Sequence, residues 1–178
     1  HPAGTGAADE NVMPAKSTAK LAYHLLKDHP EVLETSKITE KTFREGTDDK
    51  IEMSNWNFML PGLVFEYEGV DGLKTGTSDL AGYCFTGTAE RDGTRLIAVV
   101  MKAVDSNGVG SYEARFDATA KLFDYGFGQF KTQELVPANY VVEDQKSIPV
   151  TKGKEDSVGI ATKGDLSSMV KSSDKDAY

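Results

Sequence analysis

The sequence has little of what marks a disulfide-rich, membrane-spanning or nucleic-acid-binding protein. Cysteine occurs once, at Cys84 in an apolar run, so no disulfide can form within the chain and the thiol is expected to act as a small hydrophobe. No apolar run approaches the roughly 20 residues of a membrane-spanning helix, so we expect the chain not to cross a bilayer. Acidic residues outnumber basic ones by 28 to 20, the net charge is −8 and no Lys/Arg cluster stands out. Binding to nucleic acid is therefore not expected.

Motifs for a metal ion or a cofactor are also lacking. The histidines, His1, His24 and His29, share no metal-ligand spacing. Gly4 and Gly6 lack the preceding strand of a dinucleotide-binding loop, and no Gly-Lys-Ser/Thr order exists for a phosphate-binding loop. We therefore expect no cofactor and no metal. The amino end shows neither an initiator methionine nor a signal-peptide pattern, so we expect it to be the interior of a longer polypeptide.

Apolar periodicity predicts an α/β chain of the α+β type, with an antiparallel sheet flanked by helices. Residues 14–28 have the spacing of an amphipathic helix with a proline in its first turn, and residues 30–38 that of a shorter helix. Residues 43–60 are expected to be irregular. Their apolar anchor is expected to consist of Trp56, Phe58, Met59 and Leu60.

Three strands are predicted in the middle of the chain, over residues 70–77, 81–89 and 94–103, with Arg91-Asp92-Gly93 as the turn that joins the last two. Residues 96–101 are apolar at every position, which is typical of a strand that is covered on both faces and lies inside a sheet flanked by helices. A helix is expected over residues 111–125. Its apolar stripe, suited to lying on that sheet, consists of Phe116, Ala120, Phe123 and Phe127.

The character of the sequence changes after residue 130. From Thr132 onward, short β-type runs alternate with Gly, Lys and Asp. We therefore predict two domains, residues 1–130 and residues 131–178, of which the second is the beginning of a β-rich domain. It is too short to form a closed sandwich or barrel.

Ser17 and Lys20 have the Ser-x-x-Lys spacing of a serine nucleophile that is activated by a lysine one helical turn away. The spacing is weak evidence by itself, because Ser168 and Ser172 are also followed by a lysine three residues later. A lysine that acts as a base must lose its proton near neutral pH, and a solvated helix face does not promote that loss. We therefore expect Ser17 to be a helix-surface residue.

The tetrad Lys74-Thr75-Gly76-Thr77 is a better candidate for a binding site. Glycine weakens the middle of a strand, so Gly76 indicates a place where another backbone or a ligand approaches closely. Thr75 and Thr77 add hydroxyl groups, Lys74 adds a positive charge suited to a carboxylate, and an extended peptide can pair with such an edge as an added strand. From the residues alone, a β-bulge glycine beside an exposed lysine is an equally good interpretation. Arg115 is by default a surface cation, with carboxylate binding as the alternative.

A resemblance to a known family rests on the segment GVDGLKTGTSDLAGYCFTGTAERDGTRLIAVVMKA, and above all on its combination of VDGLKTG with AGYCF. Further matching stretches are MPAKSTAKLAYHLLKDHPEVLE, NWNFMLPG, RFDATAKLFDYGF and SIPVTKGKEDSVGI. The chain resembles the low-molecular-mass penicillin-binding proteins that act as serine D-alanyl-D-alanine carboxypeptidases, especially those of Gram-positive, bacillus-type bacteria. The resemblance covers essentially the whole chain. It implies the carboxyl-terminal portion of such an enzyme, with the fold of penicillin-binding proteins and β-lactamases.

The same resemblance implies roles for individual residues. Lys74 would position the terminal carboxylate of the substrate and sustain the positive field around the nucleophile, and Thr75, beside Gly76, would hydrogen-bond that carboxylate. The backbone N–H of Thr77 would supply half of the oxyanion hole. Arg115 matches a family arginine associated with carboxylate recognition. The nucleophilic Ser-x-x-Lys and the Ser-x-Asn element of the family would lie upstream of this chain.

The reaction implied by the resemblance is acyl transfer. A serine outside this chain would attack the penultimate D-alanine carbonyl of a peptidoglycan stem peptide that ends in D-Ala-D-Ala, and water would resolve the acyl-enzyme. β-Lactam antibiotics would be trapped as slow acyl-enzymes. The site would require the missing amino-terminal part of the same protein. The resemblance also implies that the protein works outside the cytoplasmic membrane and contacts the membrane only through a carboxyl-terminal anchor. A β-lactamase of the same fold and a non-catalytic module that binds cell-wall peptides remain as alternatives.

Overall fold

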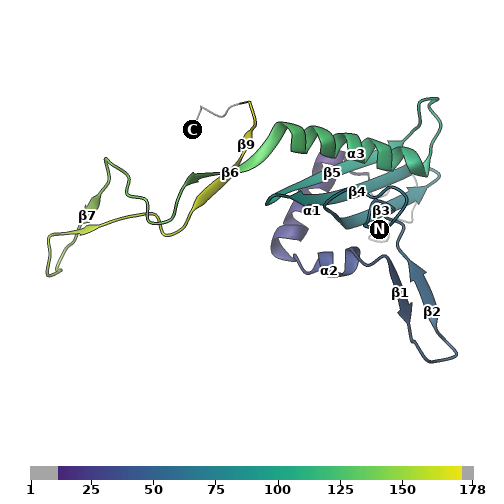
Figure 1. Ribbon diagram of the computed structural model, residues 1–178, viewed down its shortest axis with the longest axis horizontal. Helices are drawn as coiled ribbons and strands as arrows, with labels where there is room; N and C mark the ends of the chain where they lie inside the picture. Colours follow the sequence, from purple (N-terminus) through teal and green to yellow (C-terminus); the bar gives the residue numbers. More distant parts are fainter. Residues whose placement is uncertain (1–11, 174–178) are drawn as a thin grey trace. The chain divides into compact units, whose positions relative to one another are not determined.

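A three-stranded antiparallel sheet is the framework of the first part of the chain (Figure 1). The computed structural model describes residues 12–173, which divide into two units, one up to Phe127 and one from Gly128 onward. The sheet belongs to the first unit and has the strand order β3-β4-β5. Its strands lie close to the predicted bounds and are β3 (Val70–Ser78), β4 (Gly82–Arg91) and β5 (Thr94–Ala103).

A tight turn joins β4 to β5. Arg91 pairs with Thr94, so the loop consists of Asp92 and Gly93 alone. Both loop residues have positive φ, 48° and 71°, as a type I′ turn requires. The predicted hairpin is thereby confirmed, with Arg91 as the last residue of β4.

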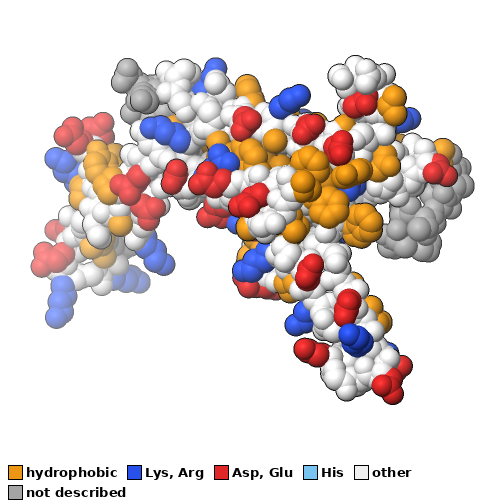
Figure 2. Space-filling model, turned by 45° about the vertical axis from the view of Figure 1, so that its right-hand side comes forward, with side chains coloured by type: hydrophobic (Ala, Val, Ile, Leu, Met, Phe, Trp, Pro, Cys, Tyr) orange, Lys and Arg blue, Asp and Glu red, His pale blue; other side chains and the backbone are white. Residues whose placement is uncertain are grey.

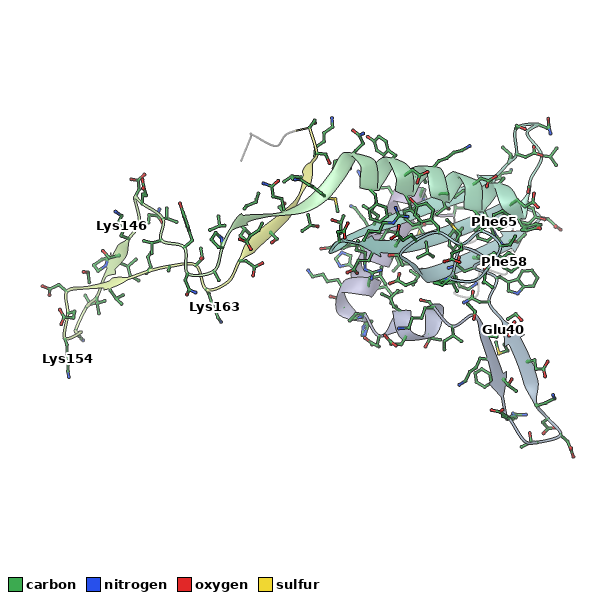
Figure 3. The ribbon with its side chains drawn as sticks, in the orientation of Figure 1. Glu40, Phe58, Phe65, Lys146, Lys154 and Lys163 are labelled. Atoms are coloured by element: carbon green, nitrogen blue, oxygen red, sulfur yellow. The ribbon has the colours of Figure 1, made fainter. Side chains whose placement is uncertain are left out.

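The helix α3 (Tyr112–Gln129) lies along one face of the sheet and supplies its aromatic core (Figure 1). Phe116 and Phe123 are each 1% exposed, and the ring of Phe116 lies 5.4 Å from that of Phe85 on β4. Phe58 and Phe65, from the segment before β3, bring their rings to 5.9 and 5.4 Å from Phe116 (Figure 3). The predicted apolar stripe is confirmed, and burial of these large rings is the main favourable contribution to folding here.

Two further helices pack against the sheet from the other side (Figure 1). The helix α1 (Ala15–Asp28) contacts β4 and β5 and buries Ala22 and Leu26, and the short helix α2 (Val32–Ser36) contacts β3. Both confirm the helices expected from the sequence. Within residues 12–173 no helix is both long and apolar enough to cross a membrane.

The prediction that β5 lies inside a sheet is wrong for the sheet that the structure describes, because β5 is an edge strand. Its coverage on both faces is confirmed as far as Val100, because residues 96–100 are buried or half-buried, whereas Met101 is 40% exposed. Ala98 is buried in the core beneath α3, whereas Val99 and Met101 face a cavity beside α1. An unbroken apolar run therefore indicates that both faces of a strand are covered. It does not indicate how many neighbouring strands the strand has.

The irregular conformation expected for residues 43–60 is also wrong in part. The strands β1 (Glu40–Phe43) and β2 (Ile51–Ser54) form an antiparallel hairpin, with Phe43 opposite Ile51. The hairpin projects from the first unit, and its surface carries acidic, basic and hydrophobic side chains together (Figures 1 and 2). Neither face packs on a core. The residues of β1 do not alternate between apolar and polar, and the four residues of β2 do so too briefly to have predicted the hairpin.

The apolar anchor expected after this hairpin is confirmed for three of its four members. Met59 and Leu60 are 1% and 0% exposed, and Phe58 packs partly buried against the core. Trp56 is 69% exposed, so it does not belong to the core, although its ring lies 6.1 Å from that of Phe58.

The second unit contains two separate two-stranded antiparallel ribbons. One pairs β6 (Phe130–Val136) with β9 (Leu166–Lys171), and the other pairs β7 (Ser147–Pro149) with β8 (Ser157–Gly159). Val170 is the one buried hydrophobic residue in the described part of this unit. The β-type pattern read from the sequence is thus present as short ribbons.

The packing of α3 on the sheet generates a stability prediction. Phe116→Ala is expected to lower the free energy of unfolding by about 3–5 kcal/mol, because it removes a fully buried ring and leaves a cavity. Phe43→Ala, at a position 52% exposed on the hairpin, serves as the control and is expected to cost about 1 kcal/mol or less. Urea unfolding followed by circular dichroism measures both. Equal losses for the two variants would contradict this description of the core.

Candidate functional site

The tetrad Lys74-Thr75-Gly76-Thr77 lies on β3, at an edge of the sheet. Within residues 12–173 β3 pairs only with β4, with Thr75 opposite Phe85. Lys74, Gly76 and Thr77 are exposed and Thr75 is half-buried. The outer edge of β3 is therefore accessible along the tetrad, and an edge strand of this kind can pair with an added peptide strand.

Gly76 has no role in packing within the first unit. A Cβ atom built at Gly76 meets no atom within 4 Å, and its φ is not among the positive ones. The pairing of Gly76 with Cys84 is regular, and the register shift of β3 lies between Val70 and Gly72. A β-bulge at Gly76, the alternative interpretation of the sequence, is therefore wrong. The missing side chain leaves space beside the strand for another molecule.

Lys74 places its charge against the backbone of the tetrad. Its Nζ donates a hydrogen bond to the carbonyl oxygen of Thr75 at 2.6 Å, and the side chain is otherwise exposed. The ammonium group thus lies against Thr75, a hydroxyl-bearing residue of the same tetrad. This combination of one cation with hydroxyl groups suits a carboxylate.

Arg115 of α3 lies next to the tetrad although it is far away in sequence. Its Nη1 donates a hydrogen bond to Oγ1 of Thr77 at 3.3 Å, and its guanidinium carbon lies 4.8 Å from the ring centre of Phe116 and 5.8 Å from that of Tyr83. Arg115 is only 3% exposed, so the default expectation of a surface cation is wrong. Burial lowers the pKa of Arg115 below its ordinary value.

The charge of Arg115 is poorly compensated within the described part of the chain. No acceptor there bonds its buried Nε, and none of the carboxylates there forms an ion pair with it. A buried charge with few partners is costly, so the guanidinium has bonding capacity left for a further acceptor such as a carboxylate. The structure thus brings Arg115 and Thr77 together at one end of the β3 edge, as carboxylate binding requires.

A cavity of about 370 Å³ lies on the α1 side of the sheet, beside Lys74, Thr75 and Gly76. The rest of its lining is largely apolar and includes Leu21, Leu25, Cys84, Val99 and Met101. Cys84 is half-buried there and its Sγ donates to the carbonyl oxygen of Ala81 at 3.4 Å, which fits the small hydrophobe expected from the sequence. An apolar lining does not suit a carboxylate, so the polar groups at the tetrad are the better ligand site.

The remaining candidates from the sequence do not join this site. Ser17 and Lys20 are both exposed on α1, as expected for surface residues. His24 is exposed, and the exposed His29 contacts Glu31. His1 and the Gly4–Gly6 motif lie outside the described residues, as does the lysine partner of Ser172.

A charged network at the start of β3 was not predicted from the sequence. Arg95 of β5 donates two hydrogen bonds to the carboxylate of Asp71, at 2.9 and 2.8 Å. These bonds are the main cause that raises the pKa of Arg95 above its ordinary value. The available signal was an aspartate inside a predicted strand, because aspartate is disfavoured there unless its side chain has a partner.

The sequence matches one protein family and several of its members. The profile of the D-alanyl-D-alanine carboxypeptidase family matches residues 2–105. The D-alanyl-D-alanine carboxypeptidase DacF of Bacillus subtilis is 32% identical over 168 residues, and DacA of Haemophilus influenzae is 34% identical over 134 residues. The two matches cover 94% and 74% of this chain. The chain spans only 40% and 30% of these relatives.

Solved structures agree with this similarity. A crystal structure described as a peptidoglycan synthesis regulatory factor (PBP3) from Streptococcus pneumoniae is 35% identical, with a TM-score of 0.76 over 90% of this chain. Penicillin-binding protein 5 from Haemophilus influenzae is 27% identical, with a TM-score of 0.64 over 90% of this chain. The chain covers 42% of each. The mixed arrangement of helices and antiparallel sheet is thus that of penicillin-binding proteins.

The open space at Gly76 leads to a stability prediction with a matched control. Gly76→Ala is expected to leave the free energy of unfolding unchanged or to raise it by up to about 1 kcal/mol, because alanine fits the strand and meets no neighbour. Gly87→Ala on β4 is expected to lower it by about 1–3 kcal/mol through overpacking. A Cβ at Gly87 would lie 2.8 Å from the ring of Phe85 and 3.1 Å from Thr119. Urea unfolding compares the two, and a large loss at Gly76 would show that this glycine is structural.

Proposed function

Because the chain belongs to the D-alanyl-D-alanine carboxypeptidase family, we propose that it is part of a serine enzyme that removes the terminal D-alanine from peptidoglycan stem peptides. The observation that carries the proposal is the accessible edge of β3, where the tetrad lies beside the buried and poorly compensated charge of Arg115. The chain spans about two fifths of its relatives, so the activity proposed is that of the complete polypeptide.

The substrate peptide is proposed to lie along the outer edge of β3 as an added strand. Its terminal carboxylate is bound by the hydroxyl group of Thr75 and by the charges of Lys74 and Arg115, with Thr77 holding the guanidinium at 3.3 Å. Gly76 keeps the edge free of side-chain atoms. The positive charges also favour the negative charge that develops when the peptide carbonyl is attacked.

The reaction is proposed to proceed through an acyl-enzyme. A serine hydroxyl supplied by polypeptide outside this chain attacks the penultimate D-alanine carbonyl, and the backbone N–H of Thr77 donates to the resulting oxyanion. The C–N bond breaks and the terminal D-alanine leaves with a proton on its amino group. Water then hydrolyses the ester. β-Lactams acylate the same serine, and the ester they form is hydrolysed slowly.

The placement of the chain within the enzyme follows from this proposal. Residues 1–130 are assigned to the carboxyl-terminal part of the catalytic domain and residues 131–178 to the beginning of a β-rich domain. An enzyme that acts on peptidoglycan works outside the cytoplasmic membrane. Membrane attachment of the complete polypeptide is proposed to occur through a carboxyl-terminal anchor.

Labelling by fluorescent penicillin tests the proposal. The complete polypeptide is expected to take one label per molecule at a serine outside residues 1–178, and the 178-residue chain alone is expected to take none. Mass spectrometry of the labelled protein locates the adduct. A penicilloyl group on Ser17 would contradict the proposal, rapid release of hydrolysed penicillin would identify a β-lactamase, and peptide binding without any acylation would identify a non-catalytic binding module.

Lys74→Ala in the complete polypeptide tests the role of the tetrad. The acylation rate is expected to fall by about 10²–10³-fold, the typical effect of removing a group that stabilises the transition state. The free energy of unfolding is expected to change little, because Lys74 is exposed. Lys41→Ala on the exposed β1 strand is the control and is expected to change neither quantity. Unfolding of the Lys74 variant near room temperature would instead show that Lys74 is structural.

A further inference from the structure

The beginning of β3, just before the tetrad, is held by a side chain that reaches across the sheet. Arg95 lies on β5, two strands away, and bonds both carboxylate oxygens of Asp71 at 2.9 and 2.8 Å. On the way it bonds Oγ1 of Thr88 on β4 at 3.0 Å and a carboxylate oxygen of Glu90 at 2.6 Å. All three strands of the sheet are therefore tied together at one position.

The backbone at the same position is fixed from the other direction. Ser36 of α2 donates from Oγ to the carbonyl oxygen of Asp71 at 2.9 Å, and Asn57 donates from Nδ2 to that of Gly72 at 3.2 Å. Asn57 is 2% exposed, so this bond is buried. Asn55 links the two donors, because its Nδ2 bonds the carbonyl oxygen of Ser36 at 3.0 Å and its Oδ1 accepts from the N–H of Asn57 at 2.9 Å.

There is no free space for β3 to shift at this point. A Cβ atom at Gly72 would lie 2.8 Å from Oγ of Ser36 and 3.2 Å from the methyl group of Thr88. The register shift of β3 against β4 also falls here, between Val70 and Gly72. Lys74 follows Gly72 by two residues, so the direction in which β3 leaves this point determines where the tetrad lies.

We propose that Asp71 and Arg95 are positioning residues for the acyl-transfer reaction: their ion pair across β4 fixes the start of β3 and thereby holds Lys74 to Thr77 in register with the serine and the substrate. This inference rests on the proposed function. β3 has no second neighbouring strand among residues 12–173, so its position is set by β4 and by this network. Neither residue belongs to the tetrad, so the proposed effect is on geometry.

The partial exposure of the ion pair distinguishes a positioning role from a purely structural one. The side chains of Asp71 and Arg95 are 25% and 27% exposed, and ion pairs reached by water contribute little to stability. A small displacement of a catalytic group, by contrast, lowers the reaction rate about 10²-fold for 1 Å. Loss of the pair is therefore expected to reduce the reaction rate more than the stability.

The experiment uses the complete polypeptide with Asp71→Asn, Arg95→Lys and the double variant. Asp71→Asn is expected to slow acylation by fluorescent penicillin about 10–100-fold, to shift the amide NMR signals of Lys74 to Thr77 and to lower the melting temperature by only a few degrees. Arg95→Lys keeps the charge without the two parallel bonds and is expected to be intermediate, which preserves the test if the asparagine variant does not fold. The double variant is expected to be acylated no more slowly than Asp71→Asn, because both changes break the same ion pair between Asp71 and Arg95.

Glu52→Gln is the matched control, because it removes a carboxylate that pairs with Lys50 on the β1–β2 hairpin, away from β3. It is expected to change neither the acylation rate nor the amide signals. If the wild-type protein is acylated and Asp71→Asn reacts at the wild-type rate with unshifted signals, the positioning role is wrong and the proposed function stands. If the wild-type protein is not acylated at all, the proposed function is wrong and the positioning role is overturned with it.

Discussion

Among residues 12–173, β3 pairs along one edge only, with β4, and the candidate site depends on this constraint. β4 is the middle strand of the sheet, and its Phe85 packs against Phe116 of α3 in the centre of the core. The hydrophobic core therefore fixes β4, and β4 fixes β3. The other edge of β3 remains accessible along the tetrad, so the strand is anchored on one side and can bind a peptide on the other.

The helix that forms the core also contributes to the site. Phe116 and Arg115 are adjacent on α3, and adjacent residues on a helix point about 100° apart. Phe116 consequently lies in the core, while Arg115 lies at the end of the sheet against Thr77. The guanidinium is buried between aromatic rings, and within residues 12–173 its Nε has no hydrogen-bond partner, which supports the proposed binding of a carboxylate there.

Much of this arrangement follows from sequence pattern. The strands of the sheet and the phenylalanine stripe of α3 were predictable because burial imposes a period on the chain. The hairpin turn at Asp92 was predictable because Asp-Gly suits the positive φ that a type I′ turn requires. The β1–β2 hairpin was not predictable, because both of its faces are largely exposed and no alternation is required. The edge position of β5 was not predictable either, because strand order depends on pairing over long sequence separations.

Within the candidate site, the sequence indicated the tetrad and offered carboxylate binding as an alternative role for Arg115, but it did not indicate that Arg115 is buried. The depth of Arg115 depends on the rings of Tyr83 and Phe116, which come from different elements. The ion pair of Asp71 with Arg95 depends on the register of three strands. Such contacts depend on the tertiary structure. In the sequence they are indicated only by an isolated feature, such as an aspartate within a predicted strand.

The edge of β3 at the tetrad is proposed to be one wall of the reactive cleft. A crystal structure of the complete polypeptide acylated by a β-lactam tests it most directly. We expect the acyl carbonyl oxygen to accept from the backbone N–H of Thr77, and the β-lactam carboxylate to lie within about 3.2 Å of donors on Thr75 and on Lys74 or Arg115. An acylated serine whose β-lactam contacts none of these residues would contradict it.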